Sequence, residues 1–131
     1  MPKHDSCHDV VAEALRREGW QVESDLQRQR NERIVYIDLR AFRQDQTALI
    51  EVKCFPNLAS PDEQYTAVGQ YLIYLTFLRL KGILHPLYLA VPDKMYEKRF
   101  DDVLLETFRT YHIKLLVFDE TNERRLQWKD W

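Results

Sequence analysis

Long apolar runs are missing from this chain of 131 residues, and so is a signal peptide. No stretch approaches the roughly 20 apolar residues that a membrane-spanning helix needs, so we expect a cytoplasmic protein with no membrane contact. Cysteine is scarce: only Cys7 and Cys54 are present, and in that compartment we expect both to be free thiols. Cys7 beside His8 suggests a nucleophile, but no local signature supplies an orienting Asn or Asp.

An excess of positive charge is absent too, because the net charge is −2 while 31% of residues are charged. No overall basic field draws the chain onto nucleic acid, so any contact with DNA or RNA requires a local patch. The length and the absence of repeats, low-complexity tracts and linkers predict one domain over residues 1–131. Three groups of arginines are candidate patches, and each is equally consistent with ordinary surface: Arg16-Arg17, Arg28/Arg30/Arg33 and Arg40/Arg43.

Helix and strand signals alternate along the chain. Ser60-Pro61-Asp62-Glu63 combines a capping box with proline at the first helical position, which predicts a helix to about Leu80. That helix is apolar round much of its circumference, so we expect it to be largely buried. Ser24–Arg33 is polar and strongly charged and predicts a mobile loop. Periodicity and turn signals predict the remaining elements: helices over about Ser6–Glu18 and Asp93–Tyr111, and strands over 20–22, Ile34–Arg40, Ala48–Cys54, Pro86–Val91, Ile113–Phe118 and Arg124–Trp128.

The resulting order is α, β-hairpin, α, β, α, β, β. Long helices separate the later strands, and a hairpin lies in the middle of the chain. This pattern predicts an α/β domain in which a mixed β-sheet is flanked by helices.

Two acids and a lysine meet on the predicted hairpin. A two-residue turn at Gln44-Asp45 places Asp38 directly opposite Glu51. Side chains alternate between the faces of a strand, so Lys53, two residues beyond Glu51, lies on the same face. We expect the opposite face to be apolar and to carry Val35, Ile37, Leu39, Ile50, Val52 and Cys54.

Such a pair of carboxylates needs a compensating charge. Their Cβ atoms lie roughly 5 Å apart, and their repulsion is about 3 kcal/mol at an effective dielectric constant of about 20. A bound Mg²⁺ offsets this repulsion, because it takes oxygen ligands from one or two carboxylates and keeps several waters. Lys53 alone offsets part of it. The trio therefore predicts either a metal site that receives a phosphate or a solvated charged face on a half-exposed hairpin.

The spacing of Asp38, Glu51 and Lys53 resembles the D-x(n)-(D/E)-x-K signature of the PD-(D/E)XK nuclease superfamily. The resemblance implies a restriction-endonuclease-like fold and a Mg²⁺ (or Mn²⁺) ion held by Asp38, Glu51 and the backbone carbonyl of Val52. A first-helix residue, often Glu, also approaches the metal in this superfamily. His8 stands in what looks like that place, which departs from the pattern.

In the later helix, Gln70-x-x-x-Tyr74 resembles the Q-x-x-x-Y element of RecB-like branches, where it supports the site. These two residues share one helical face, and we expect them to bond near Lys53. A polar spot on a core helix remains an equal alternative. Gly69, beside them, would let this helix approach the sheet closely.

Motifs along nearly the whole chain point to a narrower family. They are H-x-x-V-x-x-A-L-x-x-x-G-W from His8, Tyr36–Leu39, Ile50–Lys53, Gly69–Tyr71, Leu87–Pro92 and Leu116–Asp119. With these motifs the chain is similar to the XisH family, cyanobacterial proteins named as fdxN element excision controlling factors. The resemblance implies control of the excision of a DNA element by site-specific recombination, with DNA and an XisI-like protein as partners. A homodimer also fits, because nucleases of this type often need two sites for double-strand cuts.

These features predict metal-assisted phosphodiester hydrolysis by a Mg²⁺-dependent endonuclease. The ion held by Asp38 and Glu51 would lower the pKa of a bound water and stabilise charge developing on the phosphate. Lys53 would orient that water or neutralise the phosphate. Two alternatives stay open: a catalytically silent nuclease-fold module that binds DNA or an XisI-type partner, and a structural subunit whose charged face binds its partner.

Overall fold

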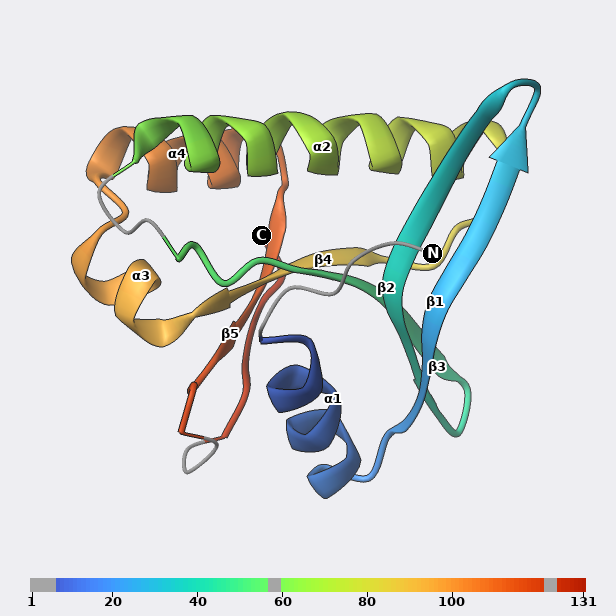
Figure 1. The fold of residues 1–131 in the computed structure, drawn as a ribbon, viewed down its shortest axis with the longest axis horizontal. Coiled ribbons are helices and arrows are strands. Elements are labelled where there is room, and N and C mark those ends of the chain that lie inside the picture. The colour runs from blue at the N-terminus through green and yellow to red at the C-terminus, as the bar shows by residue number, and fades with distance from the viewer. Residues whose placement is uncertain (1–6, 57–59, 122–124) are drawn as a thin grey trace.

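The computed structural model describes residues 7–56, 60–121 and 125–131, and of Asp25 only the backbone. Its strands form one six-stranded mixed sheet in the order β1-β2-β3-β4-β5-β6, which confirms the predicted mixed α/β architecture. Figure 1 shows the strands β1 (Gln21–Arg30), β2 (Arg33–Arg43), β3 (Gln46–Val52), β4 (Leu87–Pro92), β5 (Lys114–Phe118) and β6 (Gln127–Lys129), and the helices α1 (His8–Arg17), α2 (Pro61–Leu80), α3 (Asp93–Lys98) and α4 (Asp102–Thr110).

Helices cover both faces of this sheet, with α2, α3 and α4 on one face and α1 on the other (Figure 1). Strands β3, β4 and β5 are parallel neighbours, and right-handed crossovers between them return on the same side. Successive residues of β4 therefore enter different cores: Leu89 and Val91 pack on the α2 side, and Tyr88 and Ala90 on the α1 side. Among the described helices, none is both long and apolar enough to cross a membrane.

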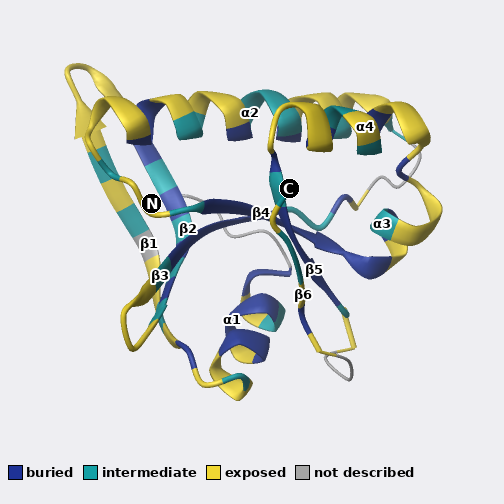
Figure 2. Cartoon of the chain, turned by 180° about the vertical axis from the view of Figure 1, so that it is seen from behind, coloured by how far each residue is buried: buried dark blue, intermediate teal, exposed yellow. Residues whose placement is uncertain are grey.

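Helix α2 has the predicted bounds but not the predicted burial. Ser60 is its N-cap, and the chain turns away at Gly82 with a φ of 74°. Figure 2 shows that only one side of α2 is buried, so the expectation of a largely buried helix was wrong. A Cβ added at Gly69 would meet nothing within 4 Å, so this glycine does not serve a close approach to the sheet either.

The segment 24–33, predicted as a mobile loop, was wrongly assigned. Residues 24–30 belong to β1, Asn31 and Glu32 form a turn, and Arg33 begins β2, with which β1 pairs from Gln21↔Phe42 to Arg30↔Arg33. Strand β1 is the edge of the sheet, where polar and charged side chains remain solvated and discourage pairing with other chains. The polar composition of β1 therefore gave no signal for a strand in the sequence.

The predicted helix Asp93–Tyr111 is two helices, α3 and α4. Phe100 between them is buried, and Asp101 caps α4 by accepting the Leu104 N–H at 2.9 Å. Aspartate at such a position competes with helix continuation by bonding the backbone itself. Elsewhere the expected elements are present, although Ser6 and Arg124, where we began the first helix and the last strand, lie outside the described residues.

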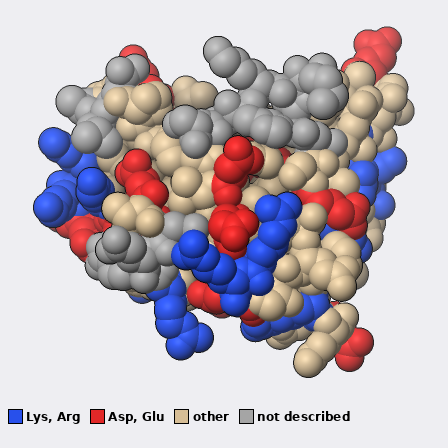
Figure 3. Space-filling model, turned by 60° about the horizontal axis from the view of Figure 1, so that its bottom comes forward, with Lys and Arg blue, Asp and Glu red and all other residues tan. Residues whose placement is uncertain are grey.

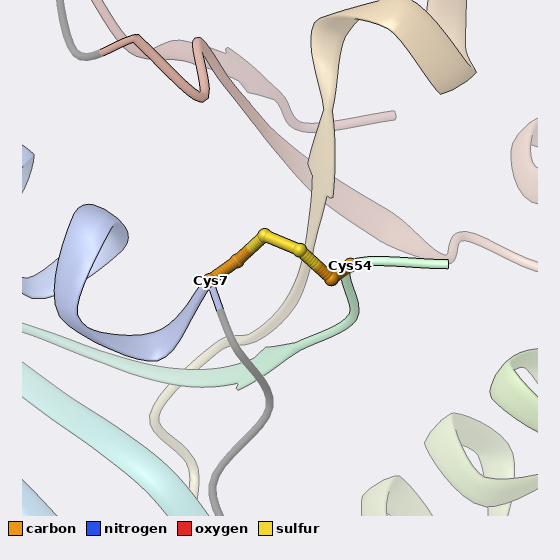
Figure 4. Close-up of a disulfide and its surroundings, with 2 residues drawn as sticks. All are labelled: Cys7 and Cys54. Atoms are coloured by element: carbon orange, nitrogen blue, oxygen red, sulfur yellow. A yellow bond between two sulfur atoms is a disulfide. The ribbon is translucent and has the colours of Figure 1, made fainter. Parts of the chain in front are cut away.

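The two cysteines are not free thiols, which corrects the expectation from composition. Cys7 and Cys54 form a disulfide with a Cα–Cα distance of 5.5 Å (Figure 4), within the usual range. The bond joins the N-cap of α1 to the segment that follows β3. His8 and Lys53 are the immediate chain neighbours of the two cysteines, so the disulfide ties together two segments that carry predicted site residues.

We predict that dithiothreitol lowers the stability of the wild-type protein by about 2–4 kcal/mol, because the bond closes a loop with a sequence separation of 47 residues. Urea unfolding with and without reductant measures this change. The double variant Cys7→Ser/Cys54→Ser is the control and should not respond to reductant. An equal response of both proteins would contradict a structural role for the disulfide.

Tyr71 fastens α2 to the centre of the sheet. Its side chain is buried, and its hydroxyl donates to the Leu87 carbonyl at 2.7 Å and accepts the Lys114 N–H at 3.3 Å. Burial also raises the pKa of this hydroxyl, so it stays a donor over the ordinary pH range.

We predict that Tyr71→Phe lowers the free energy of unfolding by about 1–3 kcal/mol, because buried groups on β4 and β5 lose their partner. Denaturant unfolding provides the measurement. Tyr111→Phe is the matched control, since Tyr111 is 61% exposed and lies outside α2. Equal stability of the two variants would show that the hydroxyl contributes nothing.

Candidate functional site

The site is built on the β2–β3 hairpin, whose register is the predicted one. Residues pair from Arg43↔Gln46 to Leu39↔Ile50, around a two-residue turn in which Gln44 has a φ of 51°. Continued by one pair, this register sets Asp38 opposite Glu51. The turn chemistry is unusual for lack of glycine, but the register follows from the turn length alone.

Beyond Leu39↔Ile50 the two acids bond to backbone amides. The Asp38 N–H donates to Glu51 Oε1 at 3.1 Å, and the Val52 N–H donates to Asp38 Oδ2 at 2.8 Å. Each carboxylate thus bonds an amide of the opposite strand, and the two side chains are held together where the hairpin strands begin to part. We call Asp38 and Glu51, with these bonds, the crossed acid pair.

The apolar side of the hairpin differs from the prediction. Val35 and Ile37 pack into the core under α2, whereas Leu39 packs with Ile50 and Val52 into the core under α1. Strict alternation would leave Ile37 and Leu39 on one face. Strand β2 therefore changes face at Asp38, and this irregularity brings the Asp38 N–H to the Glu51 carboxylate.

Glu51 is buried, with 4% of its surface exposed. Burial, and then repulsion from Asp38, raise its pKa to about 8, although the Asp38 N–H and the charge on Lys53 act in the opposite direction. Lys53 is half-buried and is close enough to influence Glu51. The structure therefore brings Asp38 and Glu51 together with the charge of Lys53 acting on Glu51, and the raised pKa favours the protonated form of Glu51 near neutral pH.

Gln70 and Tyr74 of α2 bond to each other, and Tyr74 is near enough to the crossed acid pair for the charges of both acids to raise its pKa. Gln70 Nε2 donates to the Tyr74 hydroxyl at 2.9 Å. The pKa of Tyr74 is raised, first by burial and further by the charges of Glu51 and Asp38, while the Gln70 bond lowers it. The two residues thus share one helical face, as predicted, and that face is turned toward the acids.

His8 reaches the site from the opposite face of the sheet. The ring is buried; Nε2 lies 3.3 Å from the Asp38 carbonyl oxygen, and Nδ1 lies 3.5 Å from an Asp9 carboxylate oxygen. A ring nitrogen that donates to a carbonyl cannot bind a metal through the same atom. His8 therefore contacts the Asp38 backbone through Nε2, and its role as a metal ligand stays a prediction.

The oxygen atoms of this site suit a hard divalent cation. Both acids carry carboxylate oxygens, and carboxylate and carbonyl oxygens are the ligands that Mg²⁺ and Mn²⁺ prefer. The Val52 N–H points toward Asp38, and the carbonyl of a strand residue points to the same side as its amide. Asp38, Glu51 and the Val52 carbonyl therefore fit the predicted ligand set, and a cation would compete with the proton on Glu51.

Two acids near Lys53 escaped sequence analysis as site residues. A cavity of about 280 Å³ lies between the end of β3 and the first turn of α2, and Lys53, Asp62 and Glu63 all line it. We had interpreted Asp62 and Glu63 only as signals for a helix start. The short connection from Lys53 to the Ser60 cap is the feature that could have indicated their proximity.

Comparison with known proteins gives the family. A model of the XisH family, described as "XisH protein", matches residues 1–126. The chain belongs to the XisH family. Among proteins with curated functions, none matches it.

Two solved structures resemble this XisH family member along almost its full length. An XisH family protein from Nostoc punctiforme PCC 73102 is 32% identical with a TM-score of 0.87, and the match covers 96% of this chain and 100% of the other. An fdxN element excision controlling factor protein from Anabaena variabilis is 35% identical with a TM-score of 0.88, covering 97% of this chain and 100% of the other. The family resemblance inferred from the motifs is thereby confirmed.

We predict that the metal-free protein loses stability as the pH rises from about 4.5 to 8. Over this range unfolded Glu51 loses its proton at lower pH than folded Glu51 does, so the folded state binds more protons and the free energy of unfolding falls, by roughly 4 kcal/mol. Thermal unfolding as a function of pH measures the slope. Glu51→Gln, which keeps the acceptor for the Asp38 N–H, should flatten it, and equal slopes would refute the assignment.

Proposed function

We propose that this XisH family protein acts on DNA as a Mg²⁺-dependent, endonuclease-like factor that controls excision of a DNA element. The crossed acid pair, with the charge of Lys53 acting on Glu51, is the observation that carries this proposal. The name of the Anabaena variabilis relative, an fdxN element excision controlling factor, supports the biological setting. The hairpin, the flanking helices and the Q-x-x-x-Y pair are also compatible with the PD-(D/E)XK superfamily.

In this proposal each residue has a separate task. Asp38, Glu51 and the Val52 carbonyl would hold the cation, and the chemistry it would supply there is a lowered pKa of a bound water. Lys53 meets the scissile phosphate or orients the attacking water. Gln70 and Tyr74 bond beside the acids, and His8 supports the Asp38 backbone from the other face.

DNA contact would depend on local groups of arginine. Figure 3 shows basic and acidic side chains intermixed on the face that carries α1, so that face presents no surface of one sign. Arg40 is paired with Glu23 at 2.7 Å, and Arg43 stacks over Trp20. Arg30 and Arg33 are exposed and face each other across the tip of the β1–β2 hairpin, which makes this tip the best candidate for phosphate contact.

We predict that plasmid nicking in Mg²⁺ or Mn²⁺ falls at least about 100-fold in Lys53→Ala, because the phosphate loses its charge partner. The matched control is Lys94→Ala, a change at an exposed lysine of α3. Asp38→Asn should abolish both nicking and Mn²⁺ binding. Equal cleavage by wild type and Lys53→Ala would exclude the hydrolytic proposal.

A second candidate is a catalytically silent module that binds an XisI-type partner. The bonds of both acids to backbone amides favour it, because they give the carboxylates a structural task that requires no substrate. A complex that co-purifies with wild type and is blocked by Asp38→Lys, together with absent nicking, would identify this function.

A further inference from the structure

The side of α2 that faces away from the sheet carries an apolar stripe. Its exposed members are large: Tyr65 is 68% exposed, Leu72 36%, Ile73 51% and Leu80 60%. Figure 2 shows much of this outer side of the helix as exposed. A surface helix normally turns charged residues toward water, so an apolar stripe here lacks the cover it needs. We call Tyr65, Gly69, Leu72, Ile73, Thr76 and Leu80 the outer stripe; their spacing places them on one side of the helix.

Gly69 lies in the middle of the outer stripe, and no contact among the described residues of one chain requires a glycine at this position. Glycine is unfavourable in a helix interior, yet a Cβ here would meet nothing within 4 Å, and the backbone conformation is one that any residue adopts. A helical glycine is useful where another backbone approaches closely. In a single copy of the chain no described residue makes that approach.

We propose that the outer stripe docks a second copy of this chain, with the two α2 helices packed antiparallel about a two-fold axis between Leu72 and Ile73. The stripe is self-complementary about this point. The two-fold axis sets Leu72 against Ile73 of the other copy, Tyr65 against its Leu80, and the small Gly69 against its Thr76. Large side chains then interdigitate on both sides of a close backbone approach.

Charge selects the antiparallel orientation. Helix α2 begins with Asp62 and Glu63 and ends with Arg79 and Lys81, so antiparallel packing brings the acidic end of each copy to the basic end of the other. Parallel packing would place like charges together. In a two-fold dimer, the same surface of each copy forms the contact, so one sequence supplies both complementary sides.

The surroundings of α2 widen the contact. A stable interface buries roughly 800 Å² per partner, more than a single helix about 30 Å long supplies. A cavity of about 690 Å³ opens beside Tyr65 and Gly69 and is also lined by Val103 of α4, which is 69% exposed. Leu80 of the other copy would fill this recess. Gln70 and Tyr74 lie on the inner side of α2, away from the outer stripe. Arg30 and Arg33 at the tip of the β1–β2 hairpin line a cavity with Leu72, Ile73 and Leu80, so the proposed dimer would border the proposed phosphate-contact surface.

The first test is the mass of the purified protein by size-exclusion chromatography with light scattering at about 100 µM, where an interface with a Kd of about 1 µM is nearly saturated. We expect a dimer. Ile73→Glu should weaken association at least about 100-fold, while the matched control Leu84→Glu, at a leucine 88% exposed outside α2, should remain dimeric. A monomeric wild type, or a dimer that Ile73→Glu leaves intact, would overturn the proposal.

The second test examines the geometry. Asp62→Arg and Arg79→Asp should each weaken the dimer, and the double variant should restore it, because the two positions exchange partners across the antiparallel pair. Gly69→Ala should weaken the dimer yet raise the thermal midpoint of the monomeric Ile73→Glu background. Failure of the double variant to restore association, or a Gly69→Ala dimer as strong as wild type, would refute antiparallel close packing.

Discussion

The crossed acid pair is the interaction on which the hairpin and the candidate site both depend. The ladder between β2 and β3 pairs its last residues at Leu39↔Ile50, and the amides beyond it still require acceptors because they lie in or near the core. Asp38 and Glu51 supply those acceptors. The same bonds bring two carboxylates together at a buried point, so local structure and unfavourable electrostatics arise from one arrangement.

Structure alone does not require these acids to be charged. Asn and Gln at positions 38 and 51 would accept the same two N–H groups without mutual repulsion and with a smaller cost of burial. The pKa of about 8 at Glu51 is a direct sign of what the charged form costs here. Asn and Gln would satisfy the backbone equally well, so the presence of two acids favours a function that uses their negative charge. A bound divalent cation would offset both the repulsion between the acids and the cost of burying their charge.

Sequence analysis succeeded where the determining signals are local. The bounds of α2 follow from Ser60-Pro61 and Gly82, and the pairing of Asp38 with Glu51 follows from the length of one turn. It failed where the cause lies elsewhere in the fold. The polar strand β1 is stabilised by pairing along its whole length with β2, and the Cys7–Cys54 disulfide joins segments whose proximity no local pattern encodes. Sequence analysis also missed the change of face at Asp38. It assumed that side chains alternate regularly along the strand, and β2 is irregular at Asp38.

Helix α2 was expected to be largely buried, and its exposed apolar residues explain why. An apolar circumference predicts burial on all sides, and a single copy of the chain buries only the side around Tyr71, Phe77 and Leu78. The hydrophobic effect that makes the inner side pack on the sheet acts equally on Leu72 and Ile73 outside. The prediction is wrong for the single chain, and only the proposed dimer would cover the outer stripe as well. Cover for the outer stripe has to come from another molecule, and the polarity of charge along α2 favours a copy of the same helix running in the opposite direction.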